Sequence, residues 1–180
     1  GKIGARGQKG SKLFSISGDT PKGGVHELEL GLTVQNLVDE FGDGDTKAVQ
    51  VGGVSGFCVP RKNFGKYTIG YPGKLSGDSL PTGGSIMLFN SSRSMYNVLH
   101  NYVEFFCEES CGQCTPCRVG TQQLLKGIEA IKANKKPSSY LKTLVKLADT
   151  MHVASKCGLG QSVANSFQSI VEEFREEIIY

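Results

Sequence analysis

Long hydrophobic runs are missing from this sequence of 180 residues. A membrane-spanning helix needs about 18 or more apolar residues in a row, and no stretch approaches that length. The N-terminal residues also lack the apolar segment of a secretory signal peptide. We therefore expect no direct membrane insertion, and a cytoplasmic location or the matrix or hydrogenosomal side of an organelle.

Side-chain patterns typical of acid–base enzymes are also missing. The sequence has no arrangement of Ser, His and Asp, and no pair of carboxylates that is predicted to converge. Its glycine-rich runs, at residues 52–56 and 83–84, do not follow the spacing of a P-loop or of G-x-G-x-x-G between a strand and a helix. We interpret both runs as turns, and we expect no catalytic residue in this chain by itself.

The net charge is small, at +3, and its excess lies at one end. Four cations, Lys2, Arg6, Lys9 and Lys12, precede the first acidic residue, so the remaining residues carry a net charge of −1. A short basic, glycine-rich segment on a near-neutral chain is more typical of a solvated linker than of a nucleic-acid-binding protein. We interpret residues 1–11 as a linker and expect no nucleic-acid partner.

Glycine is abundant in one part of the chain and scarce in the other. Residues 1–84 contain 19 of the 24 glycines, which marks a turn-rich part followed by a helical part. The shift predicts a small domain over residues 12–93 and a helical domain over residues 94–180.

Alternating hydrophobicity predicts strands in the first domain, at residues 12–17, 25–30, 48–51 and 85–89. Thr33 is predicted to cap a short helix between the second and third of these strands. A strand–strand–helix–strand order, with a further strand after several glycine turns, predicts a small β-grasp domain.

Four apolar stripes with helical spacing follow in residues 94–180. Their members are Met95, Val98, Leu99, Tyr102, Val103 and Phe106; Leu124, Leu125, Ile128 and Ile131; Leu141, Leu144, Val145, Ala148 and Met151; and Phe167, Ile170, Val171, Phe174 and Ile178. Stripes of this kind form the core of a helix bundle. The fold class is therefore α+β, a β-grasp domain followed by a four-helix bundle.

Six cysteines are present, and four of them indicate metal or cluster binding rather than disulfides. Cys111, Cys114 and Cys117 form a C-x2-C-x2-C run, and Cys157 follows 40 residues after Cys117. A run of this spacing with a remote fourth cysteine commonly holds a [4Fe–4S] cluster, whereas structural zinc sites usually pair two separate C-x2-C units. We favour the cluster, and keep zinc, and then a disulfide or free thiols, as alternatives.

The predicted helices bring these four cysteines together. Pro116 suits the first turn of a helix that follows the cysteine run. That helix leads away for about 15 residues, or roughly 22 Å, and the next returns to deliver Cys157 to the same end. Cys107, one turn before the run, is expected to be a buried apolar thiol, and Cys58 to be structural.

Residues beside the cysteines are predicted to shape the site. Gly112, Gly158 and Gly160 are expected to leave room for a cluster, the last two with positive φ. Arg118 and the backbone N–H groups that open the second helix are expected to stabilise added electron density and raise the reduction potential. An ion pair of Arg118 with a neighbouring glutamate is the alternative.

The run ESCGQCTPCRVG at residues 109–120, with CGLG at 157–160 and FRE at 174–176, resembles the C-terminal part of the flavin-bearing NADH dehydrogenase subunit family. This family occurs in respiratory complex I, in NAD(P)-reducing and electron-bifurcating hydrogenases, and in NAD-dependent formate dehydrogenases. Residues 10–18 and 48–53 resemble its soluble-ligand-binding β-grasp (SLBB) domain. The CGLG form is more similar to the hydrogenase and formate dehydrogenase systems.

The resemblance implies that Cys111, Cys114, Cys117 and Cys157 hold a [4Fe–4S] cluster. It implies that Gly158 and Leu159 lie on the flavin-facing side, and that FMN and NAD(H) bind an upstream domain of the family's full subunit. It also implies partner subunits, a thioredoxin-like [2Fe–2S] subunit and a multi-cluster ferredoxin-like subunit.

We therefore expect an electron-transfer module of an NADH-linked oxidoreductase, active only within a complex. One alternative is a zinc-stabilised module whose β-grasp half binds a ligand or partner without redox activity. Another is a regulatory redox sensor that loses its cluster on oxidation.

Overall fold

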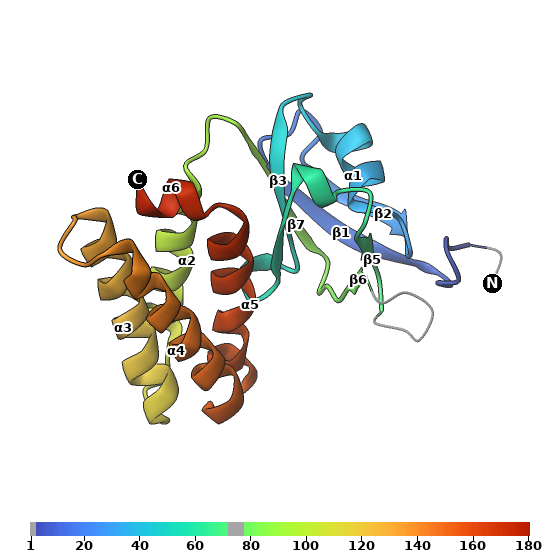
Figure 1. Cartoon of the computed structure of the whole chain (residues 1–180). Helices are drawn as coiled ribbons and strands as arrows, with labels where there is room; N and C mark the ends of the chain where they lie inside the picture. The colour runs from blue at the N-terminus through green and yellow to red at the C-terminus, as the bar shows by residue number, and fades with distance from the viewer. Residues whose placement is uncertain (1–2, 72–77) are drawn as a thin grey trace. The chain divides into compact units, whose positions relative to one another are not determined.

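The structure, a computed structural model, describes residues 3–71 and 78–180. The chain divides into two compact units, residues 1–93 and residues 94–180 (Figure 1). The division falls where the glycine-rich part of the sequence gives way to the helical part.

The first unit is built on a mixed five-stranded sheet with the strand order β2-β1-β7-β3-β4. Strands β1 and β7 are parallel, and the other neighbouring pairs are antiparallel. Its elements are β1 (Ser11–Gly18), β2 (Gly24–Glu29), helix α1 (Val34–Phe41), β3 (Thr46–Val51), β4 (Phe57–Pro60), the short pair β5 (Thr68–Ile69) and β6 (Ser79–Leu80), and β7 (Ser85–Asn90). This arrangement is the predicted β-grasp fold.

Helix α1 lies against one face of this sheet (Figure 1), and the hydrophobic core of the unit combines side chains of the sheet and of the helix. Phe14 and Ile16 alternate inward along β1 and are buried with Leu37 and Phe41 of the helix. Each fully buried side chain of this size stabilises the fold by about 1.5–3 kcal/mol. The predicted cap is present, because the Asn36 N–H donates to Thr33 Oγ1 at 3.1 Å while the Thr33 N–H donates to Asn36 Oδ1 at 3.1 Å.

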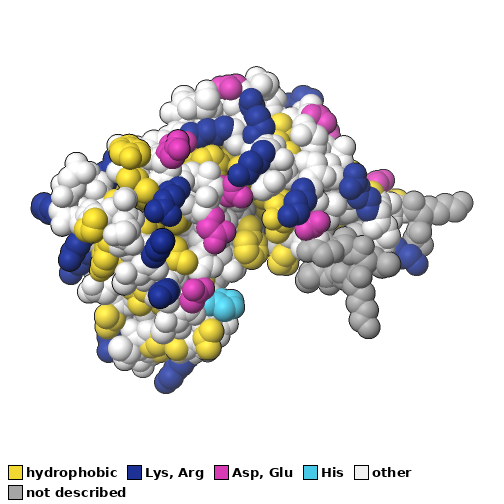
Figure 2. All heavy atoms as spheres, in the orientation of Figure 1, with side chains coloured by type: hydrophobic (Ala, Val, Ile, Leu, Met, Phe, Trp, Pro, Cys, Tyr) yellow, Lys and Arg dark blue, Asp and Glu magenta, His cyan; other side chains and the backbone are white. Residues whose placement is uncertain are grey.

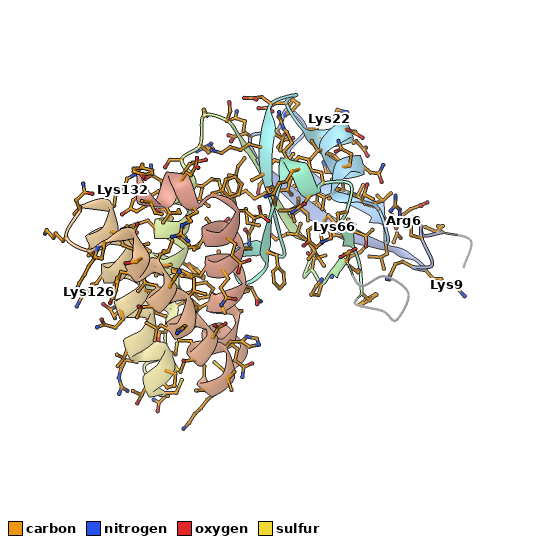
Figure 3. The ribbon with its side chains drawn as sticks, in the orientation of Figure 1. Arg6, Lys9, Lys22, Lys66, Lys126 and Lys132 are labelled. Carbon is orange, nitrogen blue, oxygen red and sulfur yellow. The ribbon has the colours of Figure 1, made fainter. Side chains whose placement is uncertain are left out.

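The N-terminal segment, predicted to be a solvated linker, is instead hydrogen-bonded to this unit. The Ala5 N–H donates to the Leu30 carbonyl at 2.8 Å, and the Leu30 N–H donates to the Gly10 carbonyl at 3.0 Å. Arg6 and Lys9 remain exposed on this segment (Figure 3). The backbone pairing, which composition does not report, makes residues 3–10 part of the folded unit.

The second unit is a bundle of four main helices with a short fifth. They are α2 (Met95–Glu109), α3 (Thr115–Lys132), α4 (Leu141–Ala154), α5 (Gly158–Glu173) and α6 (Arg175–Ile179). Helix α2 packs on α3 and α5, and α4 packs on the same two helices. The core consists largely of the predicted stripes, to which Val163 and Ala164 of α5 are added.

Local sequence sets the ends of these helices. Ser94 caps α2 by accepting from the Asn97 N–H at 3.4 Å, and Pro116 occupies the first turn of α3. At Phe174 the backbone leaves helical geometry (φ −123°), so the fourth predicted stripe is divided between α5 and α6.

The outer surface of the bundle carries charged side chains together with exposed apolar ones such as Val119 and Val153. Lys and Arg side chains lie over α3 and α4 (Figure 2). Lys126 projects from α3 into solvent (Figure 3), whereas Lys132 Nζ lies 4.9 Å from the centroid of the Tyr96 ring. Within residues 3–71 and 78–180, none of the helices combines the length and the hydropathy that crossing a bilayer requires.

Candidate metal centre

Three cysteines lie where α2 passes into α3. Helix α2 ends at Glu109, and the extended backbone of Ser110 turns the chain away from the helix axis. Cys111 is exposed in the turn, Cys114 is half-buried as the residue before α3, and Cys117 is buried in the first helical turn. The C-x2-C-x2-C spacing therefore wraps around the N-terminus of one helix.

A left-handed glycine and an arginine close this turn. Gly112 has φ +74°, a conformation that is costly for residues with a Cβ. Arg118 Nη1 donates to the Gly112 carbonyl at 2.5 Å. Arg118 thus contributes to the shape of the turn, a role that was not predicted from the sequence.

The loop before α5 lies against this turn. The backbone N–H of Lys156 lies near enough to Cys114 to lower the pKa of its thiol, and Cys157 directly follows as the residue before α5. A Cβ placed on Gly160, in the first turn of α5, would lie 3.0 Å from the Cβ of Cys117. The up-down topology therefore brings the segment of Cys157 to the cysteine run, as predicted.

Backbone amides and burial act on the thiols in opposite directions. The N–H groups of Lys156 and then Cys117 lower the pKa of the Cys114 thiol, and the thiolate is the form that binds metals. Burial raises the pKa of the Cys107 thiol, and the Thr121 side chain offsets part of this effect. Cys107 is half-buried rather than fully buried as expected, and its surroundings favour the neutral thiol.

Two serines at this end were not predicted from the sequence to belong to the site. Ser110 Oγ lies 3.2 Å from Cys117 Sγ, within hydrogen-bonding distance. Ser155 is 5% exposed, and among the described residues its hydroxyl has no hydrogen-bond partner. One signal was available, since Ser110 directly precedes the first cysteine of the run and Ser155 stands two residues before Cys157.

The glycines of the CGLG motif differ from the expectation in one respect. Gly158 and Gly160 belong to helix α5 and neither has positive φ, because this loop ends at Cys157 and the helix begins at once. Gly158 is exposed and Leu159 is half-buried. His152 Nδ1 donates to the Gln161 carbonyl at 2.9 Å and so helps to fix the start of α5.

The residues at this end fit an iron–sulfur cluster. Soft thiolates are the donors that such clusters use, backbone N–H groups lower the pKa of the Cys114 thiol, and a Cβ at Gly160 would crowd Cys117.

Comparison with protein families gives a match over the helical unit. Residues 97–180 match the NADH-ubiquinone oxidoreductase-F iron-sulfur binding region. This range contains all four candidate cysteines and most of the bundle.

Relatives extend the similarity over both units. The chain is 32% identical over 174 residues to the NAD-reducing hydrogenase HoxS subunit alpha of Cupriavidus necator, covering 97% of this chain and 28% of that protein. It is 29% identical over 180 residues to the NADP-reducing hydrogenase subunit HndC of Solidesulfovibrio fructosivorans, covering 97% and 36% respectively. The chain thus spans less than half the length of these relatives.

A solved structure has the same fold. An NAD+-reducing [NiFe]-hydrogenase in the H2-reduced state superimposes with a TM-score of 0.85 and 33% identity, covering 98% of this chain and 30% of that one. The chain therefore belongs to the family of flavin-bearing NADH dehydrogenase and NAD(P)-reducing hydrogenase subunits, as the C-terminal region that includes their iron–sulfur binding region.

Proposed function

We propose that the helical unit holds one [4Fe–4S] cluster through Cys111, Cys114, Cys117 and Cys157. When bound, such a cluster takes up and releases single electrons. The protein would then serve as the electron-transfer module of an NADH-linked oxidoreductase that works as a complex.

The contact between the two cysteine segments is the observation that carries this proposal. A Cβ on Gly160 would lie 3.0 Å from the Cβ of Cys117, so the segment that begins at Cys157 approaches the turn that holds the other three cysteines. The Lys156 N–H lowers the pKa of the Cys114 thiol and so favours the thiolate, the form that binds iron. Because Cys117 is buried in the first turn of α3, the bundle also shields its thiol from water.

Gly158 and Leu159 are proposed to face a flavin. Both follow Cys157 directly, and the exposed Gly158 has no side chain to keep a planar ring at a distance. FMN and NAD(H) are assigned to a domain outside these 180 residues, in keeping with the names of the NAD- and NADP-reducing relatives. Electrons would continue to partner subunits, of thioredoxin-like [2Fe–2S] and ferredoxin-like multi-cluster types.

Metal analysis of the intact protein, purified without oxygen, tests the proposal. We expect about four irons and four acid-labile sulfides per chain, with a broad visible absorption that dithionite bleaches. Cys157→Ala should lose most of the iron, because one corner of the cluster is left without a thiolate.

Cys107→Ala is the matched control, since Cys107 is a thiol of the same helical end whose surroundings favour protonation. This variant should keep its full iron content. A colourless protein with one zinc per chain would instead support the zinc-stabilised binding module. Iron retained by Cys157→Ala and lost by Cys107→Ala would replace Cys157 with Cys107 in the ligand set.

A further inference from the structure

A serine hydroxyl contacts the sulfur of Cys117. Ser110 directly follows α2, Cys117 lies in the first turn of α3, and Ser110 Oγ is 3.2 Å from Cys117 Sγ. Cys117 is 5% exposed and Ser110 is half-buried, so water competes weakly for this contact. A cysteine that binds iron is a thiolate and can only accept, which makes Ser110 the donor.

The turn orients this hydroxyl towards the sulfur. The Gly112 N–H donates to Ser110 Oγ across 3.4 Å and engages one of its lone pairs, which leaves the O–H hydrogen free for Cys117. Gly112 is in turn held by Arg118 Nη1 through its carbonyl. Arg118, Gly112, Ser110 and Cys117 therefore form one chain of contacts that fixes the donor at the sulfur.

We propose that Ser110 raises the reduction potential of the centre by donating a hydrogen bond to Cys117 Sγ. The inference rests on the proposed function, because it assigns Cys117 as a ligand. One-electron reduction adds negative charge that the ligand sulfurs share, so a donor at a sulfur stabilises the reduced form more than the oxidised form. Ser110 is a tuning residue, outside the set that binds iron.

Ser110 can be tested separately from the other donors of the site. The backbone N–H groups of Lys156 and then Cys117 lower the pKa of the Cys114 thiol, and a substitution of the Ser110 side chain leaves these groups in place. Ser162 provides a control in the same unit, since its hydroxyl donates to the Leu159 carbonyl at 3.1 Å and leaves the sulfur contact unchanged.

A redox titration of the intact protein, followed by electron paramagnetic resonance with dithionite as the electron donor, measures the effect. Ser110→Ala should keep its iron and sulfide. It should shift the equilibrium with a reference couple about five- to tenfold towards the oxidised form, where tenfold corresponds to about 59 mV for one electron. Ser110→Thr, which keeps a hydroxyl, should have a reduction potential close to that of the wild type. Ser162→Ala should leave the potential unchanged.

The Thr and Val variants of Ser110 give a shape-matched pair in case the Ala variant is unstable. A lower potential in Ser110→Val than in Ser110→Thr, at equal iron content, supports the inference. Equal potentials in that pair overturn it and leave the proposed function intact. Zinc in place of iron in the wild-type protein would overturn the proposed function first, whatever the Ser110 variants do.

Discussion

Left-handed glycines are frequent in the β-grasp unit, whereas every glycine of the helical unit except Gly112 lies within a helix. Gly18 and Gly84 have φ of +88° and +108°, and the space for a Cβ at each is taken by the backbone of a neighbouring strand or turn. Gly120, Gly127 and Gly160 lie within helices, and the space for their Cβ atoms is taken by side chains.

The difference shows why each unit needs glycine at these positions. In the β-grasp unit, glycine permits a backbone conformation that other residues avoid. In the bundle, glycine permits close approach, with Gly120 against Met151 and Gly127 against Leu144, while Gly160 lies against Ser155 and Cys117. Among these three helical glycines, only Gly160 lies at the candidate site. Alanine substitutions at different glycines therefore test separately the effects of backbone conformation, of side-chain packing and of packing at the candidate site on iron content.

The largest effect is expected for Gly18→Ala, at the end of β1. The alanine would have to adopt the φ of +88° that Gly18 has, and its Cβ would meet the backbone of Leu88 on β7, with the Leu88 nitrogen 2.9 Å away. A left-handed residue costs about 1–2 kcal/mol and overpacking about 1–3 kcal/mol, so we expect the β-grasp unit to lose about 3 kcal/mol or more. Hydrogen exchange of the amides that pair β1 with β7 measures this loss.

Gly44→Ala is the matched control, because Gly44 also has positive φ (+89°) but no atom lies within 4 Å of its Cβ position. It should cost only the conformational part, about 1–2 kcal/mol. Equal losses in the two variants would show that handedness alone, without the contact to β7, decides stability in this unit.

The next largest effect is expected for Gly160→Ala, at the candidate site. The new Cβ would lie 2.6 Å from Ser155 Oγ and 3.0 Å from Cys117 Cβ. Overpacking of about 1–3 kcal/mol is partly offset by the higher helix propensity of alanine, about 1 kcal/mol. We expect a modest loss of stability, seen by urea denaturation, and a lower iron content because the loop of Cys157 is pushed from the turn.

Gly158→Ala, two residues earlier, is its control. Nothing lies within 4 Å of the Gly158 Cβ position and its φ is not left-handed, so stability and iron content should stay at wild-type values. Unchanged iron in Gly160→Ala would mean that the close approach at Cys117 is unrelated to metal binding.

Much of the bundle could be predicted because its signal is periodic. Met95, Leu124, Leu141 and Phe167 belong to stripes that the structure buries, and Ser94 and Pro116 mark helix starts that obey general capping rules. The break at Phe174 was not predicted, since its apolar spacing continues across a change in backbone direction that only tertiary packing determines.

The less regular parts of the molecule were harder to predict. Strand β4 (Phe57–Pro60) has only four residues and ends in proline, so it lacks a readable alternation, and the N-terminal segment is held by backbone bonds that composition does not encode. At the site, spacing and topology predicted that the segment of Cys157 returns to the cysteine run, and a Cβ on Gly160 would lie 3.0 Å from that of Cys117. The set of four ligands stays a prediction. The Ser110 contact depends on the angle of one turn, which the sequence does not specify.

The smallest effect is expected at an ion pair that closes the β-grasp unit. Arg93 Nη2 lies 2.7 Å from Asp19 Oδ1, and the Asn90 N–H donates to the same carboxylate at 3.0 Å. The hydrogen bonds from Arg93, and then that from Asn90, lower the pKa of Asp19 below its ordinary value. The pair therefore stabilises the folded state above the unfolded-state pKa of about 3.9 and stops doing so as the pH falls through the lower folded-state pKa.

Asp19→Asn should reduce the stability of this unit at neutral pH by less than about 1 kcal/mol, because Arg93 is largely exposed and solvent screens the pair. It should also flatten the loss of stability on acidification below about pH 4, measured by urea denaturation across that range. Arg93→Leu removes the donor and its charge and keeps the carboxylate, so it should flatten the same limb. If the wild type and both variants lose equal stability between neutral pH and about pH 2, this pair does not contribute to the acid sensitivity of the unit. The stability of the unit would then depend more on backbone conformation at residues such as Gly18 than on this pair.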